Sequence, residues 1–269
     1  MVRSGVLWAW WLLLVGGLAW GQVPFSELEL LFTSAASLPG EVRGLKAECR
    51  LCGITAVDEW TLYTSAQGRI QSFCFHPQDT KLFFVRPGSG EIRVVQLTPV
   101  GPLAEWVLYE HPRPVYDLAF GEGPDGEASL YFSELDGEGW GRILRLEGDG
   151  DVSVALSVWG GPGFHWGGFF SFGPDGAVYL SSGGRLPGRL YRWSSRGPEE
   201  LFRIEGDRIG GFVFLDLNTI LYANLDGEIH LLELAGGRQT PIYRSRGRFR
   251  ISDVGLLPTW WPLVAHEGR

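Results

Sequence analysis

The sequence predicts an all-β fold, a β-propeller of four-stranded blades arranged around one axis. Three observations carry this prediction. The chain is rich in glycine and aromatic residues, it shows no long amphipathic helical pattern, and one strand–turn–strand pattern recurs along it. An isolated four-stranded sheet has two faces to bury, and stacking such sheets around an axis buries each face against a neighbour.

The first residues predict an exported protein. Arg3 supplies a positive charge, residues 6–15 form an apolar stretch, and Ala19-Trp20-Gly21 has the small residues of a cleavage site. An uncleaved anchor is the alternative, but the uncharged stretch is at the lower limit for crossing a bilayer. We therefore expect a signal peptide at 1–21, one propeller domain at 22–269, no membrane span after cleavage, and a periplasmic or secreted location.

The acidic charge of the chain excludes some partners by default. Its formal net charge is -8 and becomes -9 when Arg3 leaves with the signal peptide. Nucleic acids and anionic membranes attract basic surfaces, so neither is expected to bind this protein.

The repeat begins with an apolar strand that ends in an aromatic residue, followed by a tight turn. Its copies begin at Phe73-Cys74-Phe75, Leu118-Ala119-Phe120, Phe170-Ser171-Phe172 and Phe212-Val213-Phe214. The closing residues are Phe75, Phe120, Phe172 and Phe214, with Leu256 in the fifth place. They lie 42 to 52 residues apart, which is the length of a propeller blade.

Each copy continues with an apolar second strand and an alternating third strand. The predicted pairs are 82–85 with 91–94, 130–132 with 141–146, 178–180 with 188–193, and 220–222 with 227–232. Outer strands are indicated by two matching segments, Glu59-Trp60 with Leu62-Tyr63 and Glu105-Trp106 with Leu108-Tyr109.

Both ends of the repeat array contain partial copies. Residues 30–34 and 40–45 match the second and third strands, whereas 251–256 match a first strand and 261–265 a second strand. We expect the N-terminal strands to complete the last blade and so close the ring. The predicted number of blades is six, with five as the alternative.

The turns at Phe172-Gly173-Pro174-Asp175-Gly176 and Phe75-His76-Pro77-Gln78-Asp79 resemble the blade pattern of six-bladed TolB-like, NHL-type and gluconolactonase-type propellers. The resemblance covers nearly the whole mature chain. It implies the fold and leaves the function open, because these propellers include hydrolases, dehydrogenases, lyases and binding scaffolds.

This sequence lacks the motif that forms the metal site of the gluconolactonase-type propellers. That site needs an Asn-Asp pair entering a strand, whereas Asn218 precedes Thr219 and Asn224 precedes Leu225. We therefore expect no metal site and no cofactor, with a divalent cation only as an accessory to an enzyme.

The cysteines have two interpretations. Cys49 and Cys52 have the spacing of half a zinc site or of a redox pair, and Cys74 with His76 could complete a zinc set. Cys74, however, occupies a repeat position that elsewhere takes small packed residues. In an oxidising compartment we expect a Cys49–Cys52 disulfide or two inert thiols.

The linkers before the first strands carry a series of cationic or titratable side chains. Arg69, Arg208 and Arg250 stand six residues before the closing residue, and Arg113 and His165 stand seven before it. Trp166 extends the series, and nearby loops add Arg86, Trp140, Arg185, Arg246 and Arg248.

Arginine binds carboxylate or phosphate through two parallel hydrogen bonds, and tryptophan stacks on sugar rings. The predicted ligand-binding residues at one channel mouth are therefore Arg69, Arg113, His165, Trp166, Arg208 and Arg250. The expected ligand is an anionic small molecule, a carbohydrate or a partner protein. In the structural alternative these arginines pair with blade acids such as Asp117, Asp207 and Asp253.

Two acids suggest an enzyme as the competing function. Asp117 and Asp253 stand three residues before the closing residue, near the channel, and together with His165 they are the candidate catalytic residues. The function would be that of a lactonase-like hydrolase or a sugar-oxidising enzyme. Since the same repeat position holds Ser72, Phe169 and Gly211 in the other copies, no acidic ring forms, and we prefer a non-catalytic binding protein.

Overall fold

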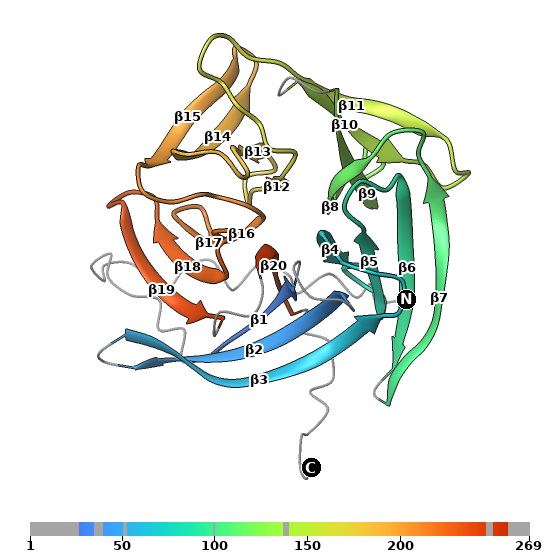
Figure 1. The fold of residues 1–269 in the computed structure, drawn as a ribbon. Helices are drawn as coiled ribbons and strands as arrows, with labels where there is room; N and C mark the ends of the chain where they lie inside the picture. The colour runs from blue at the N-terminus through green and yellow to red at the C-terminus, as the bar shows by residue number, and fades with distance from the viewer. Residues whose placement is uncertain are drawn as a thin grey trace, which may run out of the picture.

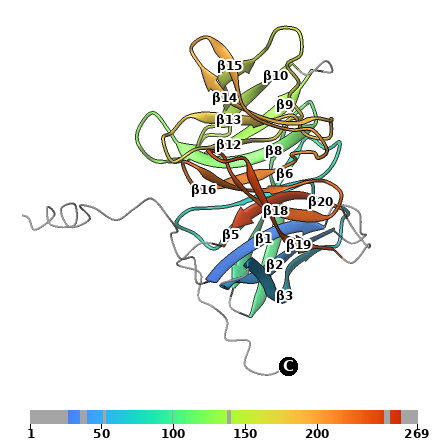
Figure 2. The same ribbon diagram turned by 90° about the vertical axis from the view of Figure 1, so that its left-hand side faces the viewer.

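The computed structural model describes residues 27–34, 40–50, 53–98, 100–136, 140–245 and 250–257. In this part of the chain, twenty β-strands form five four-stranded sheets. Figure 1 shows the sheets arranged around a common centre, and Figure 2 gives the view from the side. The predicted all-β propeller is confirmed. Within these residues, no helix is long and apolar enough to cross a bilayer.

We number the blades I to V and give their strands from the centre outward. Blade I contains β20 (Ile251–Leu256), β1 (Glu27–Ser34), β2 (Gly40–Arg50) and β3 (Gly53–Ser65). Blade II contains β4 (Ser72–Phe75), β5 (Lys81–Val85), β6 (Glu91–Thr98) and β7 (Gly101–Glu110). Blade III contains β8 (Val115–Glu122), β9 (Ala128–Leu135), β10 (Gly141–Leu146) and β11 (Val152–Val158).

The last two blades follow the same order. Blade IV contains β12 (Phe170–Phe172), β13 (Val178–Ser181), β14 (Gly188–Ser194) and β15 (Gly197–Ile204). Blade V contains β16 (Phe212–Asp216), β17 (Thr219–Ala223), β18 (Glu228–Glu233) and β19 (Arg238–Arg244).

Blade I combines strands from the two ends of the described chain. β20 pairs antiparallel with β1, with Leu30 opposite Leu256 and Phe32 opposite Val254. The partial N-terminal copy thus supplies the three strands that the partial C-terminal copy needs. The predicted count of six blades is wrong: four complete copies and this one shared blade give five blades in the described part of the chain.

The hydrophobic core lies between the blades. The second strands β5 and β17 are buried along almost their whole length, whereas the outer strand β7 alternates between half-buried and exposed residues. One apolar cluster joins Leu31 and Val42 of blade I to Phe73 and Phe84 of blade II. Each sheet is therefore stabilised mainly by the apolar faces of its neighbours.

The closing aromatic residues make these contacts in a repeated way. The rings of Phe120 and Phe83 lie 5.3 Å apart, and those of Phe172 and Tyr131 lie 4.9 Å apart, both edge to face. Each ring thus packs on an aromatic residue from the second strand of the preceding blade, a geometry that aromatic pairs prefer. The inner strands contact one another from blade to blade around the centre, as the radial arrangement requires.

The tight turns between first and second strands have the geometry that their residues require. In the turn after β8, the Asp125 carboxylate accepts a hydrogen bond from the Glu127 backbone N–H at 3.2 Å. Gly126 adopts a φ of 81°, which a side chain would strain. The turns lie on one face of the propeller, which we call the turn face, and the linkers between blades lie on the opposite linker face.

The two matching outer segments form equivalent links between blades. The Tyr63 hydroxyl of β3 donates to Glu105 of β7, and the Tyr243 hydroxyl of β19 donates to Glu59 of β3 at 3.0 Å. Glu105 in turn accepts from Arg93 at 2.6 Å. The outer strands of blades V, I and II are therefore joined by polar contacts as well as by apolar packing.

Several predicted features lie outside the described residues. They are the signal peptide at 1–21, the strand at 261–265, Cys52, Arg246 and Arg248. The side chain of Cys49 also lies outside the described part of the structure. The Cys49–Cys52 disulfide and the exported location remain predictions.

Candidate functional site

The linker face is built from two kinds of loop that hydrogen-bond to each other. In blade II the His111 N–H of the linker donates to the carbonyl of Gly90, in the loop between the second and third strands, at 2.9 Å. In blade IV the Gly188 N–H donates to Asp207 O at 2.8 Å. The linkers and these loops therefore form one surface, as the sequence predicted.

The predicted cationic residues occupy this face in different environments. Arg69 and Arg250 are exposed. Arg113 is half exposed, with its guanidinium 3.9 Å from Glu134. Arg208 is neutralised by Asp226, at 3.0 and 3.3 Å from the two carboxylate oxygens. The structural alternative therefore holds for Arg208, although its partner is Asp226 rather than one of the acids named from the sequence.

Trp166 lies in the core and not on the surface. It is 3% exposed, its indole N–H donates to the carbonyl of Phe169 at 2.9 Å, and its ring packs directly over Gly141. The prediction of Trp166 as a ligand-binding residue is therefore wrong. The linker turns inward at Trp166 because this ring fills the space that Gly141 leaves. The predicted stacking surface cannot include this ring.

Among the described residues, Trp140 and Trp159 are exposed aromatic residues of this face. Gly141 of β10 pairs with Val158 of β11, so the residues just beyond this pair, Trp140 and Trp159, lie next to each other. Their exposed fractions are 52% and 56%. Two large apolar side chains are thus exposed to solvent just beyond the same end of the β10–β11 ladder.

A group of basic side chains gathers around Glu134 of β9, which pairs with Arg142, two residues after Trp140. Arg142 and His111 both contact Glu134, which is 1% exposed, with His111 Nε2 at 2.6 Å. These hydrogen bonds and charges lower the pKa of Glu134 and outweigh the effect of its burial. Glu134 was not identified from the sequence, although a carboxylate among the apolar residues of a second strand was a signal for it.

The linker from Trp159 continues to a second basic group in blade IV. The His165 Nδ1 atom lies 3.1 Å from Arg185 Nη1, and Leu186, beside Arg185, is 56% exposed. Partial burial and the nearby Arg185 lower the pKa of His165, so this imidazole is neutral at pH 7 and accepts the arginine N–H.

The two candidate catalytic acids lie inside the central channel and join neighbouring blades. Asp117 accepts hydrogen bonds from the Ser72 hydroxyl of blade II and from the Phe170 N–H of blade IV, the latter at 2.7 Å. Asp253 accepts from the Phe73 N–H at 3.1 Å. Burial raises the pKa of both carboxyls, that of Asp253 to about 7, and Asp253 raises the pKa of Asp117 further.

The channel contains a cavity of about 290 Å³ that both acids line. Its other walls come from the inner strands, including Phe75, Phe120 and Phe172. His165 is not among the lining residues, because it lies in the linker beside Arg185. The structure thus brings Asp117 and Asp253 together but does not join His165 to them.

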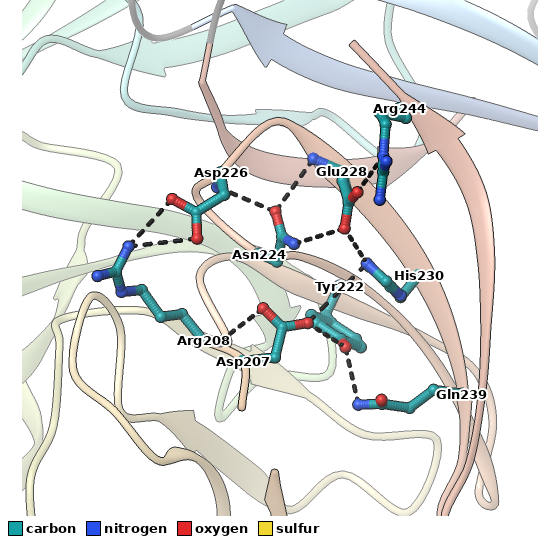
Figure 3. A network of polar contacts seen from close by, with 9 residues as sticks. All are labelled: Asp207, Arg208, Tyr222, Asn224, Asp226, Glu228, His230, Gln239 and Arg244. Carbon is teal, nitrogen blue, oxygen red and sulfur yellow. Dashed lines mark hydrogen bonds and ion pairs between the residues drawn. The ribbon is translucent and has the colours of Figure 1, made fainter. Parts of the chain in front are cut away.

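A polar network fills the linker face of blade V (Figure 3). Asp207, Asn224, Asp226, Glu228 and Gln239 line a depression of about 510 Å³. The acids have internal partners: Tyr222 donates to Asp207 at 2.9 Å, and Glu228 contacts His230 and Arg244. In the part of the chain that the structure describes, no group of three or more His, Cys, Asp or Glu residues is arranged to hold a metal ion.

Comparison with known proteins identifies the fold only. No protein-family model matches the chain, and the search of curated proteins found no match. A chain of the nidogen/laminin complex is similar, with a TM-score of 0.54 and 10% identity over 85% of this chain and 97% of that chain. A predicted 6-phosphogluconolactonase from Bacteroides fragilis has a TM-score of 0.50 and 11% identity, over 88% and 99% of the two chains.

TolB from Acinetobacter baumannii is also similar, with a TM-score of 0.48 and 16% identity over 81% of this chain and 53% of that chain. The similarity to the first two structures, at 10 and 11% identity, shows the fold alone and does not transfer a site. The function must therefore be argued from the residues of this chain.

Proposed function

We propose that the protein is a non-catalytic binding module that recognises an acidic segment of a partner protein. The binding surface is the part of the linker face formed by Trp140, Trp159, Leu186, Arg113, Arg142 and Arg185, which we call the tryptophan–arginine patch. The observation that carries the proposal is the adjacent pair of tryptophans, each more than half exposed.

The composition of the patch is that of a protein interface. Tryptophan and arginine contribute most to the binding energy of known interfaces, and a cluster of large exposed apolar side chains is unusual on a protein that has no partner. The tryptophans lie just beyond the paired ends of β10 and β11, so the ladder fixes the positions of the backbones that carry them.

The charge of the patch indicates an acidic partner. The whole chain has a formal net charge of -8, yet Arg113 and Arg142 both contact Glu134, which is buried. Arg185 has the neutral His165 as its contact, and the exposed Asp136, bonded through its N–H to the carbonyl of Trp140, is an acid of this segment that lies in solvent. Local positive charge on an acidic protein orients an acidic partner and speeds its association.

Two further considerations support binding rather than catalysis. One structure with this fold was solved in a complex of two proteins, nidogen and laminin. The catalytic alternative needs Asp117 or Asp253 to act with His165, which lies outside their cavity. The predicted signal peptide puts the proposed binding in the periplasm or outside the cell.

The test compares the double variant Trp140→Ala/Trp159→Ala with the control Trp106→Ala. Trp106 on β7 is also exposed, at 39%, but lies on the outer strand of blade II. The wild type and each variant are used to capture proteins from the extracytoplasmic fraction, and the captured proteins are quantified. A protein that the wild type captures is then purified, and its affinity is measured by calorimetry. We expect the double variant to bind the captured protein at least tenfold more weakly than the wild type does. Trp106→Ala should bind it like the wild type, and the thermal stability of both variants should change little.

Added salt should also weaken the binding, because the arginines contribute through charge. If the double variant binds every captured protein as the wild type does, the patch is not the interface. If instead an oligosaccharide or a small anion binds in a way that depends on Trp140 and Trp159, the ligand is a carbohydrate or an anion and the protein-partner proposal is wrong.

A further inference from the structure

The central channel contains a second candidate site, independent of the tryptophan–arginine patch. The cavity of about 290 Å³ is lined by residues of the five inner strands and by Pro77, which lies in a turn on the turn face. Linker residues are not among its lining residues. The cavity therefore occupies the half of the channel that leads to the turn face, opposite the patch.

The walls and the inner end of this cavity differ in chemistry. The ends of the inner strands supply Phe75, Phe120, Phe172 and Leu256, whereas Asp117 and Asp253 stand farther along their strands toward the linker face. A molecule entering from the turn face thus passes aromatic rings before it reaches the two carboxylates.

The two carboxylates have no basic partner among the described residues. Asp117 and Asp253 are 2% and 5% exposed, and their hydrogen bonds come only from the Ser72 hydroxyl and from backbone N–H groups. Other partly buried acids are paired with bases, as in Glu91–Arg93, Glu134–Arg142 and Glu228–Arg244.

A buried carboxylate pair requires a compensating positive charge or a proton. Each oxygen of a carboxylate accepts up to two hydrogen bonds, and each of these four oxygens has one donor in the contacts just described. The pair therefore retains acceptor capacity for a donor that enters through the cavity.

The aromatic walls favour an organic cation over a metal ion. Phenylalanine rings present a negative face to cations and an apolar surface to carbon chains. Among the described residues, no set of three metal-ligating side chains forms here. A cavity of this size also matches a small molecule better than a macromolecule.

We propose that this half of the channel binds a small primary amine, with its ammonium group against Asp117 and Asp253 and its apolar body among the phenylalanine rings. The ammonium supplies the three N–H donors and the positive charge that the acid pair lacks. The apolar body displaces water from the rings and adds a hydrophobic contribution.

Binding of the amine competes with protonation of the acids. The titratable residues that line this cavity are Cys74 on β4, Asp117 on β8 and Asp253 on β20, and Cys74 also packs against the apolar cluster between blades II and III. β12 and β16 contribute phenylalanine, serine and valine side chains. Burial raises the pKa of Asp253 to about 7. The amine should therefore bind tightly above this pH and weakly below it.

The experiment titrates the full-length protein with n-butylammonium, and with n-butanol as a neutral control of similar shape. Calorimetry at pH 8.5 and pH 5.5 measures affinity, and carbon NMR of the aspartate carboxyls follows their titration. We expect saturable binding at pH 8.5, at least tenfold weaker binding at pH 5.5, and a lower titration midpoint for the carboxyls in the presence of the amine.

Two variants test whether butylammonium binds at the channel acids or at acids elsewhere on the protein. Asp117→Asn should weaken butylammonium binding at least tenfold, whereas Asp226→Asn, on the linker face, should leave it unchanged. Because the wild-type NMR titration needs no variant, the test stands even if Asp117→Asn does not fold.

The proposal is wrong if butylammonium shows no saturable binding at pH 8.5. It is also wrong if n-butanol binds equally well, since the cavity would then be a purely apolar site, or if Asp117→Asn folds and binds as the wild type does. None of these three results would affect the tryptophan–arginine patch, which lies on the opposite face.

Discussion

At the scale of single residues, the partner of a side chain decides its role more than its type does. Asp226 lies in solvent and neutralises Arg208, whereas Asp117 and Asp253 are buried without a basic partner among the described residues and accept backbone hydrogen bonds across blade boundaries. The first acid is an ordinary surface charge. The other two acids join neighbouring blades, and we expect them to make the stability of the propeller depend on pH.

The stability of the protein should fall as pH rises because of the Asp117–Asp253 pair. An acid with a higher pKa in the folded than in the unfolded state stabilises the protein below its unfolded pKa, near 4, and loses this contribution as pH rises through the folded pKa, here about 7. Asp117→Asn removes one of the two charges. Its oxygen can accept from Phe170 N–H, and its amide can donate to Ser72.

We therefore expect Asp117→Asn to be more stable than the wild type at pH 8, by roughly 1 to 3 kcal/mol, and equal to it near pH 4. Urea unfolding at both pH values measures the difference. A variant that is less stable than the wild type by the same amount at both pH values would show that Asp117 acts only as a hydrogen-bond acceptor.

At the scale of elements, three inner strands contain a closing aromatic residue that packs on the preceding blade: Phe120 of β8, Phe172 of β12 and Phe214 of β16. β16 has five residues, and its Phe214 ring lies 4.5 Å from that of Tyr179 in blade IV. Such a strand has few hydrogen bonds of its own, so the contact between blades supplies much of its stability. This explains why the closing aromatic is the clearest repeated feature of the sequence.

We expect Phe214→Ala to lower the free energy of unfolding by about 3 to 4 kcal/mol, because Phe214 is buried against the neighbouring blade. Leu217→Ala, in the turn directly after β16, is the matched control: Leu217 is 54% exposed, and its loss should change stability by about 0.5 kcal/mol or less. Guanidinium unfolding of the three proteins gives both values, and equal costs for the two variants would contradict the role of the aromatic contact.

At the scale of the whole molecule, the β20–β1 pairing joins the two ends of the described chain. β20 contacts the inner strands β16 and β4 on either side, and Asp253 of β20 accepts from the Phe73 N–H of β4. Removing β20 would expose the apolar faces of blades V and II and leave β1 without its inner neighbour.

A chain ending at Ser245 should therefore lose its cooperative thermal transition, whereas a chain ending at Leu257 keeps β20 and should retain it. Circular dichroism during heating distinguishes the two. If the shorter chain melts at the same temperature as the longer one, blade I does not need its inner strand, and the coupling between the two ends is unimportant for stability.

The sequence by itself determined the repeat, the closing aromatics, the strand order within a blade and the position of the linker residues. These follow from local patterns, because alternation, turn residues and spacing are properties of neighbouring positions. It also indicated that the two ends contribute partial copies. The predicted number of blades was nevertheless wrong, although four complete copies and one blade shared by the two ends add up to the five sheets of the structure.

Only the tertiary structure decided which side chains are exposed and which charges are paired. Trp159 and Trp166 lie in one linker and are indistinguishable by spacing, yet Trp166 fills the space over Gly141 while Trp159 lies in solvent. Likewise Asp226 pairs with Arg208, and Asp117 meets only Ser72 and a backbone N–H. Contacts between residues far apart in the chain set burial and charge pairing, and no local pattern encodes them.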